Sequence, residues 1–346
     1  MKANVLKAVG DLQYIDYKTP VLKRGWALVK VKAAGICGSD VARVFTTGTY
    51  HFPTIIGHEF AGIVDSVFDS DDDGWIGKRV SVFPLIPCGD CPNCKEGKYE
   101  LCSHYNYLGS RCDGGFAEYV AVPKWNLLKI SDNISMESAA MFEPASVALH
   151  ALRNAKVKIG DNVAIVGPGT IGMIEVQLSM IAGAKNVILI GRSQEKLDYA
   201  SQKFGIRVIN SLKDNVTDII NETTDGQGVD IAVEGTGASQ SMEICLNIAK
   251  SSGTILAMGN PLGDMHLDKA SYWKILRKQL TMVGTWNSAY GTSHSDWDTI
   301  KSLVEQNKLN LEQLITHRFD LSGLLEGLEI MRNPKIYSNK VMIINK

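Results

Sequence analysis

Hydrophobic and polar positions alternate along short stretches of the first part of the chain. Residues 26–33 read Trp-Ala-Leu-Val-Lys-Val-Lys-Ala, and residues 60–67 and 79–83 have a similar pattern. A period of two is typical of a β-strand with one buried face, because successive side chains point to opposite sides. The first part of the chain is therefore predicted to be rich in β-structure.

The pattern changes between residues 160 and 285, where short apolar runs alternate with stretches of helical period. The apolar runs occupy residues 162–166, 187–190, 206–209, 230–234, 254–258 and 280–284. Strands separated by helices form parallel sheets with right-handed crossovers, and ligands bind such sheets at the carboxyl ends of the strands. We expect an α/β fold with a doubly wound parallel sheet of six strands.

Two further segments connect this region to the rest of the chain. Residues 135–154 have helical period and begin with Ser135, a favourable N-cap residue, so one helix is expected to link two domains. Residues 339–344 read as a last strand without a place in the parallel sheet. The sequence thus predicts a first domain of residues 1–149 and 286–346, interrupted by a second domain of residues 150–285.

Composition narrows the possible partners. The 346-residue chain has a formal net charge of -1, with neither a long basic run nor an apolar stretch of membrane-spanning length. No nucleic acid or membrane partner is expected, and the N-terminus lacks a signal-peptide pattern, so we expect a cytoplasmic protein. The acidic run 69–74 is interpreted as a solvated turn rather than a calcium loop, whose ligand spacing it lacks. Methionine and aromatic residues between 272 and 286 are interpreted as core or as a subunit contact.

Residues that bind metals lie in two glycine-rich stretches. Cys37 belongs to Cys-Gly-Ser-Asp, and His58 and Glu59 belong to Gly-His-Glu-Phe-Ala-Gly. Thiolate and imidazole suit zinc, and a carboxylate can complete a catalytic site that keeps one position open. Taken alone, Cys37 and His58 are better interpreted as a buried thiol and a core histidine, and two further features reverse that preference.

Four further cysteines, within a lobe at about residues 86–104, indicate a second metal site. They have the spacing Cys-x2-Cys-x2-Cys-x7-Cys, at Cys88, Cys91, Cys94 and Cys102. This spacing fits a closed tetrahedral zinc site, which would order a lobe of low apolar content. Two disulfides are the alternative, but nothing else in the chain indicates export. Cys112 and Cys245 are expected to be reduced thiols.

A glycine-rich turn follows the first strand of the parallel region. Its members are Gly167, Pro168, Gly169, Thr170, Ile171 and Gly172. The first glycine allows a tight turn, the second lets the backbone approach a pyrophosphate, and the third permits close packing of helix on strand. Because strand, turn and helix occur in the required order, a dinucleotide site is predicted at the helix N-terminus.

These motifs, together with Phe142-Glu143-Pro144, resemble the zinc-dependent medium-chain dehydrogenases over nearly the whole chain. The likeness is greatest to the polyol branch, in particular to the galactitol-1-phosphate 5-dehydrogenase and sorbitol dehydrogenase types. Residues 109–119 and 276–278 carry the most similar segments. The resemblance implies a Rossmann domain and a β-rich, GroES-like catalytic domain with a structural zinc lobe.

The resemblance also implies roles for individual residues. It assigns a catalytic zinc to Cys37, His58 and Glu143, and places Glu59 either on the metal or behind its ligands. Glu143 could instead cap a helix. Ser39 would bond the substrate oxygen and begin proton release, and the relay would continue through Tyr50 or His51. Tyr50 and Arg111 are candidate substrate contacts; a guanidinium matches phosphate geometry, although Arg111 could be an ordinary surface residue.

The cofactor choice follows from the end of the second parallel strand. NAD-using enzymes of this fold have an acidic residue there that bonds the ribose 2′-hydroxyl. This chain has Gly191 instead, followed by Arg192 and Ser193, which can bond a 2′-phosphate. NADP(H) is therefore expected over NAD(H). In the alternative, Arg192 stacks on adenine and both cofactors work.

The predicted function is reversible oxidation of a secondary hydroxyl of a polyol or polyol phosphate, with two zinc ions per chain. By resemblance, the enzyme would be a homodimer or homotetramer. A vicinal diol or threonine is an alternative substrate. A nucleotide-binding protein without chemistry is a further alternative, against which the three expected zinc ligands argue.

Overall fold

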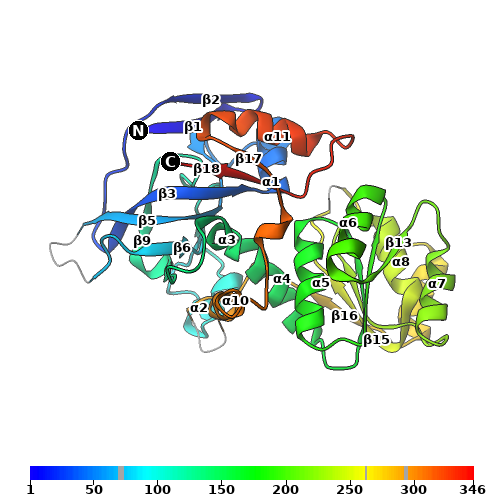
Figure 1. The fold of residues 1–346 in the computed structure, drawn as a ribbon. Helices are drawn as coiled ribbons and strands as arrows, with labels where there is room; N and C mark the ends of the chain where they lie inside the picture. Colours follow the sequence, from blue (N-terminus) through cyan, green and yellow to red (C-terminus); the bar gives the residue numbers. More distant parts are fainter. Residues whose placement is uncertain (69–73, 262, 292–294) are drawn as a thin grey trace. The chain divides into compact units, whose positions relative to one another are not determined.

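The structure is a computed structural model that describes residues 1–68, 74–261, 263–291 and 295–346. The acidic run interpreted above as a turn falls on residues 69–73, outside the described residues, apart from Gly74. The chain divides into two compact units (Figure 1). The first unit is Met1–Ser146 with Ser288–Lys346, and the second is Val147–Asn287.

The first unit is built mainly on antiparallel strands. Its largest sheet has the order β10-β6-β5-β3-β18-β17, with β9 also paired to β3. Two smaller sheets have the orders β2-β1-β4 and β7-β8. The strands are β1 (Lys2–Ala8), β2 (Asp11–Asp16), β3 (Trp26–Ile36), β4 (Thr54–Ile55), β5 (Glu59–Val67), β6 (Arg79–Val82), β7 (Leu85–Ile86), β8 (Asn106–Tyr107), β9 (Tyr119–Pro123), β10 (Leu127–Lys129), β17 (Ile315–Phe319) and β18 (Lys340–Ile344).

The three strands predicted in the first part of the chain are confirmed as β3, β5 and β6. β3 pairs with β5 on one side, and its last residues pair with β18 on the other, where Val341 faces Ile36. The strand predicted at residues 339–344 therefore returns to the first unit, as expected from its lack of a place in the parallel sheet. This pairing brings the end of the chain beside Cys37.

Short helices complete the first unit. They are α1 (Gly38–Ala42), α2 (Pro92–Lys95), α3 (Met136–Ala140), α10 (Asp296–Glu305) and α11 (Leu324–Arg332), and α11 contacts both β17 and β18. Figure 1 shows α11, in orange-red, beside β18. Among the described residues, no helix combines the length and apolar character needed to cross a bilayer.

The prediction of a single helix over residues 135–154 is wrong. Ser135 does cap a helix, because its side chain accepts a hydrogen bond from the Ser138 backbone N–H at 3.0 Å, but this helix is the short α3. A second helix, α4 (Phe142–Ala155), begins after Met141. Pro144 has no N–H to donate to the preceding turn, which accounts for the break and suits the first turn of a new helix.

The second unit contains a parallel sheet with the order β13-β12-β11-β14-β15-β16, so the predicted six-stranded, doubly wound sheet is confirmed. Helices lie on both of its faces: α5 contacts α6, whereas α8 contacts α7 and α9 (Figure 1). The elements are β11 (Asn162–Val166), α5 (Thr170–Ile181), β12 (Asn186–Gly191), α6 (Gln194–Phe204), β13 (Arg207–Asn210), α7 (Val216–Thr223), β14 (Val229–Glu234), α8 (Ser239–Ile248), β15 (Ala249–Ala257), α9 (Lys269–Arg277) and β16 (Thr281–Gly284).

Large side chains of α9, of β16 and of the residues just after it lie on the surface of this unit. Those at least about two-fifths exposed are Tyr272, Trp273, Leu276, Met282 and Trp286. For the methionine and aromatic residues among them, the core interpretation is wrong, and the alternative of a subunit contact stays a prediction. Within the described residues, β16 is an edge strand that pairs only with β15.

Candidate functional site

The four-cysteine lobe brings its sulfur atoms together as separate thiols. The Cys88 and Cys94 sulfurs lie 3.9 Å apart and those of Cys91 and Cys102 lie 4.0 Å apart. A disulfide would require about 2.05 Å, whereas a tetrahedron of Zn–S bonds of about 2.3 Å separates its sulfurs by about 3.8 Å. The geometry therefore favours the metal site over the two disulfides.

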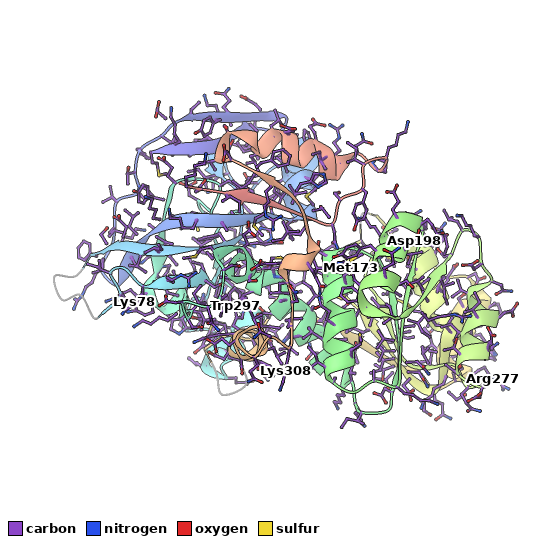
Figure 2. The ribbon with its side chains drawn as sticks, in the orientation of Figure 1. Lys78, Met173, Asp198, Arg277, Trp297 and Lys308 are labelled. Carbon is purple, nitrogen blue, oxygen red and sulfur yellow. The ribbon has the colours of Figure 1, made fainter. Side chains whose placement is uncertain are left out.

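Backbone groups and aromatic rings support this lobe. The Cys88 N–H donates to the Cys102 sulfur at 3.3 Å, and hydrogen bonds from the Ser103 and Cys94 backbone lower the pKa of Cys91 to about 6. Thiolate is the form that binds a metal. The Tyr99 ring packs edge-on against Trp125 at 5.1 Å between centroids, and through Tyr290 this aromatic group reaches Trp297 on α10, which Figure 2 labels.

A second group of metal-binding atoms comes from the ends of two paired strands. Cys37 follows β3 and is the N-cap of α1, while His58 immediately precedes β5 and Glu59 is its first residue. One ligand atom from each of Cys37, His58 and Glu59 lies within 4.8 Å of the others. Gly57 has φ +97°, a conformation that favours glycine, and this turn delivers His58 to the group.

The Glu59 carboxylate is buried beside two features of the fold. A Cβ on Gly35, opposite Glu59 in β3, would overlap Glu59 Oε2, so glycine leaves the space that the carboxylate occupies. Lys340 Nζ donates to Glu59 Oε2 at 2.5 Å and to the Ile36 carbonyl at 3.1 Å. Burial alone would lower the pKa of Lys340, but the negative charges of Glu59 and Cys37 outweigh it and raise that pKa.

Asp40 supports both Cys37 and His58. Its Oδ2 accepts from the Cys37 backbone N–H at 3.0 Å, and its Oδ1 lies 3.5 Å from His58 Nδ1. Burial opposes charge on His58, yet Asp40 raises the pKa of this histidine well above its usual value. Because Nδ1 faces the Asp40 carboxylate, the other ring nitrogen, Nε2, is the one available to bind a metal.

Ser39 lies between the metal-binding group and a guanidinium. Arg43 Nη1 donates to Ser39 Oγ at 2.8 Å and to Asp40 Oδ1 at 3.2 Å. The serine oxygen therefore accepts one hydrogen bond from a cation and keeps a lone pair and a proton for another partner. This arrangement can orient the hydroxyl that the sequence predicts to begin proton release.

Glu143 lies in the first turn of α4 and is buried. Its Oε1 accepts from the Tyr107 hydroxyl at 3.0 Å, while the Tyr107 ring lies 5.9 Å from that of His58. Burial, with the charge of Glu59, raises the pKa of Glu143 to about 7 despite the opposing effect of His58. The structure thus groups Glu59, rather than Glu143, with Cys37 and His58, and leaves Glu143 nearby without a cation of its own.

Thiolate, imidazole and carboxylate are together a donor set that suits zinc. The orientation of His58 by Asp40 and the buried Glu143 carboxylate fit such an ion, because a carboxylate buried without a cation is costly. Sequence reasoning missed four supporting residues, Asp40, Arg43, Tyr107 and Lys340. A signal existed only for Lys340, a cation inside the apolar strand β18.

The glycine-rich turn in the second unit has the expected form. Gly167 has φ +127°, and a Cβ on Gly172 would overlap the Gly167 carbonyl, so both positions require glycine. Gly169 is the N-cap of α5 and provides no side-chain cap, while a Cβ there would meet nothing within 4 Å. Thr170 and Ile171 begin the helix. The open helix N-terminus fits a pyrophosphate.

Gly191 is the last residue of β12, where an acidic residue would discriminate against NADP. A Cβ on Gly191 would overlap the ring of Pro168, so the Gly-Pro-Gly turn itself excludes a larger residue here. Arg192 and Ser193, the residues that follow, are both exposed, and Ser193 makes no capping hydrogen bond at the start of α6. The residues that follow β12 therefore offer hydrogen-bond donors, and no carboxylate occupies position 191.

Comparison with known proteins agrees with these two sites. Residues 23–132 match the family model Alcohol dehydrogenase GroES-like domain, and residues 170–306 match Zinc-binding dehydrogenase. Galactitol 1-phosphate 5-dehydrogenase of Escherichia coli (strain K12) is 36% identical over 347 residues, 99% of this chain and 100% of that protein. L-threonine 3-dehydrogenase of Yersinia pestis (strain Pestoides F) is 32% identical over 350 residues, 99% of each chain.

Solved structures are similar over the same extent. Galactitol-1-phosphate dehydrogenase from Escherichia coli has a TM-score of 0.92 and 34% identity, covering 99% of this chain and 100% of that one. A zinc-binding dehydrogenase from Sinorhizobium meliloti 1021, bound to NADP, has a TM-score of 0.91, 29% identity and coverage of 99% and 98%. An alcohol dehydrogenase from E. coli CFT073, complexed with NADH, has a TM-score of 0.90, 28% identity and coverage of 99% of each chain.

Proposed function

The chain belongs to the zinc-dependent medium-chain dehydrogenases, and from this premise we propose that it oxidises a secondary hydroxyl of a polyol or polyol phosphate, reversibly, with a nicotinamide cofactor. The observation that carries the proposal is the group formed by Cys37, His58 and Glu59, with Glu143 beside it. Zinc bound there would act as a Lewis acid that lowers the pKa of the substrate hydroxyl, and the nicotinamide would accept hydride.

Cys37, His58 and Glu143 are proposed as the ligands of this zinc. Glu59 already has a buried counter-ion in Lys340, whereas Glu143 has only a phenol as partner and a pKa raised to about 7. A buried carboxylate without a cation is the one that gains most from a metal. Glu59 and Lys340 would then act behind the ligands, where such partners orient the metal site.

Ser39 is proposed to take the proton of the substrate hydroxyl. The hydrogen bond from Arg43 Nη1 fixes the position of Ser39 Oγ and leaves it one lone pair with which to accept that proton. Tyr50 or His51 is the proposed continuation of the relay. The Tyr50 hydroxyl accepts from Arg111 Nη2 at 3.3 Å, and His51 Nδ1 lies 3.1 Å from the Thr54 hydroxyl.

NADP(H) is proposed as the preferred cofactor, bound by the turn Gly167–Gly172 and by Gly191, Arg192 and Ser193. Replacing Arg192 by Ala should lower kcat/KM for NADP by about 10- to 100-fold, the value of a charge-assisted hydrogen bond, and change kcat/KM for NAD much less. Arg207→Ala is the matched control, because Arg207 is an exposed arginine of the neighbouring strand that pairs with Glu222. A native enzyme that prefers NAD would contradict the proposal.

The substrate class is tested with galactitol 1-phosphate, galactitol, a vicinal diol and L-threonine, by following the absorbance of the reduced nicotinamide. Threonine is the second candidate, because the L-threonine 3-dehydrogenases are full-length relatives of this chain. We expect the polyol or its phosphate to give the highest kcat/KM. A higher value for threonine would reassign the substrate, and no turnover of any of the four by zinc-loaded protein would oppose the proposed chemistry.

A homodimer or homotetramer in the cytoplasm is proposed for the assembled enzyme. The exposed side chains of Tyr272 and Trp273 on α9, Met282 on the edge strand β16 and Trp286 just after it support a contact between copies of the chain. All seven cysteines are free thiols, which suits a reducing compartment. Light scattering gives the mass of the assembly, and the variant Trp273→Glu should reduce it.

A further inference from the structure

Arg111 occupies an unusual position in the first unit. Its guanidinium carbon lies 4.1 Å from the centroid of the Tyr50 ring and 4.5 Å from that of the Tyr105 ring. Both rings are therefore within cation–π distance of the same guanidinium.

No carboxylate neutralises Arg111 among the described residues. The nearest acidic residue in sequence is Asp113, whose Oδ1 instead accepts from the Ile55 backbone N–H at 2.9 Å. With the residues that the structure describes, the Arg111 side chain makes one polar contact, from Nη2 to the Tyr50 hydroxyl at 3.3 Å. Arg111 is thus a fixed, half-buried cation that retains most of its five N–H donors.

The turn that contains Arg111 makes hydrogen bonds with residues that precede His58 in the sequence. The Arg111 carbonyl lies 3.1 Å from His51 Nε2, and the Gly115 N–H donates to the Gly57 carbonyl at 2.8 Å. A Cβ on Gly114 would overlap this same carbonyl, which shows how closely the two segments approach. The position of Arg111 is therefore fixed relative to the candidate zinc site by backbone contacts, independently of its own side chain.

A series of neighbouring aromatic rings also runs from His58 to Arg111. The rings of His58 and Tyr107 are 5.9 Å apart, those of Tyr107 and Tyr105 are 6.2 Å apart, and Tyr105 then packs against Arg111. A substrate that reaches both the metal-binding group and the guanidinium would have to be several bonds long, as the carbon chain of a polyol is.

We propose that Arg111, in contact with Tyr50 and Tyr105, binds the phosphate of a phosphorylated polyol and so sets the preference for the phosphorylated substrate. The inference rests on the proposed function, because it names the substrate class of the same site. A guanidinium donates two parallel hydrogen bonds to a phosphate, and contact with two tyrosine rings limits the rotamer freedom that would be lost on binding. A structural role, in which Arg111 only joins two loops, predicts no dependence on phosphate.

The test compares galactitol 1-phosphate with galactitol in the zinc-loaded, full-length enzyme. Arg111→Gln should lower kcat/KM for the phosphate by about 10- to 100-fold, the value of a charge-assisted pair, and change kcat/KM for galactitol less than about threefold. Arg111→Lys should retain part of the preference through its charge, whereas Tyr105→Leu should weaken it by loosening the guanidinium. Equal losses for both substrates in Arg111→Gln would overturn the proposal.

Arg332→Gln is the matched control. Arg332 is also a guanidinium stacked on a ring in this unit, 4.6 Å from the Phe45 centroid, but its side chain is more than half exposed and lies beside Glu329. We expect no change in the ratio of the two kcat/KM values. An equal change in this variant would mean that loss of any stacked arginine alters the ratio, and would also overturn the proposal.

Calorimetry with galactitol 1-phosphate separates this proposal from the proposed function. The native enzyme could bind galactitol 1-phosphate without turning it over, and Arg111→Gln could weaken that binding. This result would support the phosphate subsite and oppose the proposed dehydrogenase activity. Turnover of galactitol that is unaffected by Arg111→Gln, with no tighter binding of its phosphate, would support the dehydrogenase and overturn the subsite. Absence of binding by the native enzyme would also overturn the subsite.

Discussion

The two groups of metal-binding residues in the first unit are assembled in different ways. The four cysteines come from one short stretch, residues 88–102, and neutral backbone N–H groups and aromatic rings support them. Cys37 and His58 come from the ends of two paired strands, and charged partners, Asp40 and Lys340, support their group. We therefore expect the lobe to depend on a bound metal for its order, and the strand-end group to be held in place by the sheet before any metal binds.

The largest expected effect is on turnover, and it should separate the two metal-binding groups by function. Cys37→Ala or His58→Ala should reduce turnover by about 10³-fold or more, because the Lewis acid is lost, and should change the melting temperature little. Cys91→Ala should instead lower the melting temperature and disturb assembly, since the lobe loses its metal. Activity assays, calorimetric melting and zinc analysis measure the three quantities.

Cys112→Ala is the control for these variants, because Cys112 belongs to neither metal-binding group. It should retain both activity and two zinc ions per chain. An active Cys37→Ala enzyme whose strand-end site is shown to hold no zinc would disprove the proposed mechanism. A fully stable, correctly assembled Cys91→Ala protein would remove the contrast between the two groups.

A smaller effect should distinguish the carboxylates of Glu59 and Glu143, which both lie at the candidate catalytic zinc site. Glu143→Gln should leave about one zinc per chain after dialysis, because the buried carboxylate that lacks a cation becomes neutral. Glu59→Gln should keep the second zinc but bind it about 10- to 100-fold more weakly, as expected for a residue behind the ligands. Zinc titration of each variant measures the affinities, and the reverse order would identify Glu59 as the ligand.

Local patterns in the sequence predicted much of the molecule, and long-range contacts explain what they could not. The alternation of residues 26–33 and the six apolar runs depend on neighbours in sequence, and so does the strand–turn–helix order around Gly167. The contact of Lys340 with Glu59 depends on β18 pairing with β3, which no local pattern contains. The break in the predicted helix at Met141 was recoverable, because Pro144 was visible in the sequence.

The second unit extends the comparison, because it has a buried carboxylate without a charged partner among the described residues. Glu175 lies in α5, is fully buried, and neither carboxylate oxygen has a hydrogen-bond partner in the described structure. Glu59 has Lys340 and Glu143 has Tyr107, whereas burial alone acts on Glu175 and raises its pKa from 4.5 to about 8. Its protonated, neutral form is therefore the one compatible with the fold.

This difference predicts a dependence of stability on pH that Glu175→Gln should remove. Between about pH 4.5 and 8 the unfolded chain has lost the Glu175 proton while the folded chain retains it, so folding takes up a proton and stability falls as pH rises. The fall ends above about pH 8, where both states are ionised. Relative to the native protein, Glu175→Gln should gain nothing near pH 4.5 and roughly 2–4 kcal/mol near pH 8.

Melting temperatures of the native protein and the variant, measured from pH 5 to 9, test this expectation. Their difference should grow in favour of Glu175→Gln up to about pH 8 and then stay constant, because the pH dependence of zinc binding is common to both proteins and cancels. Glu222→Gln is the control, since Glu222 lies on the surface of the same unit and pairs with Arg207. A constant difference between Glu175→Gln and the native protein across the range would mean that Glu175 is ionised in the fold and finds a cation there.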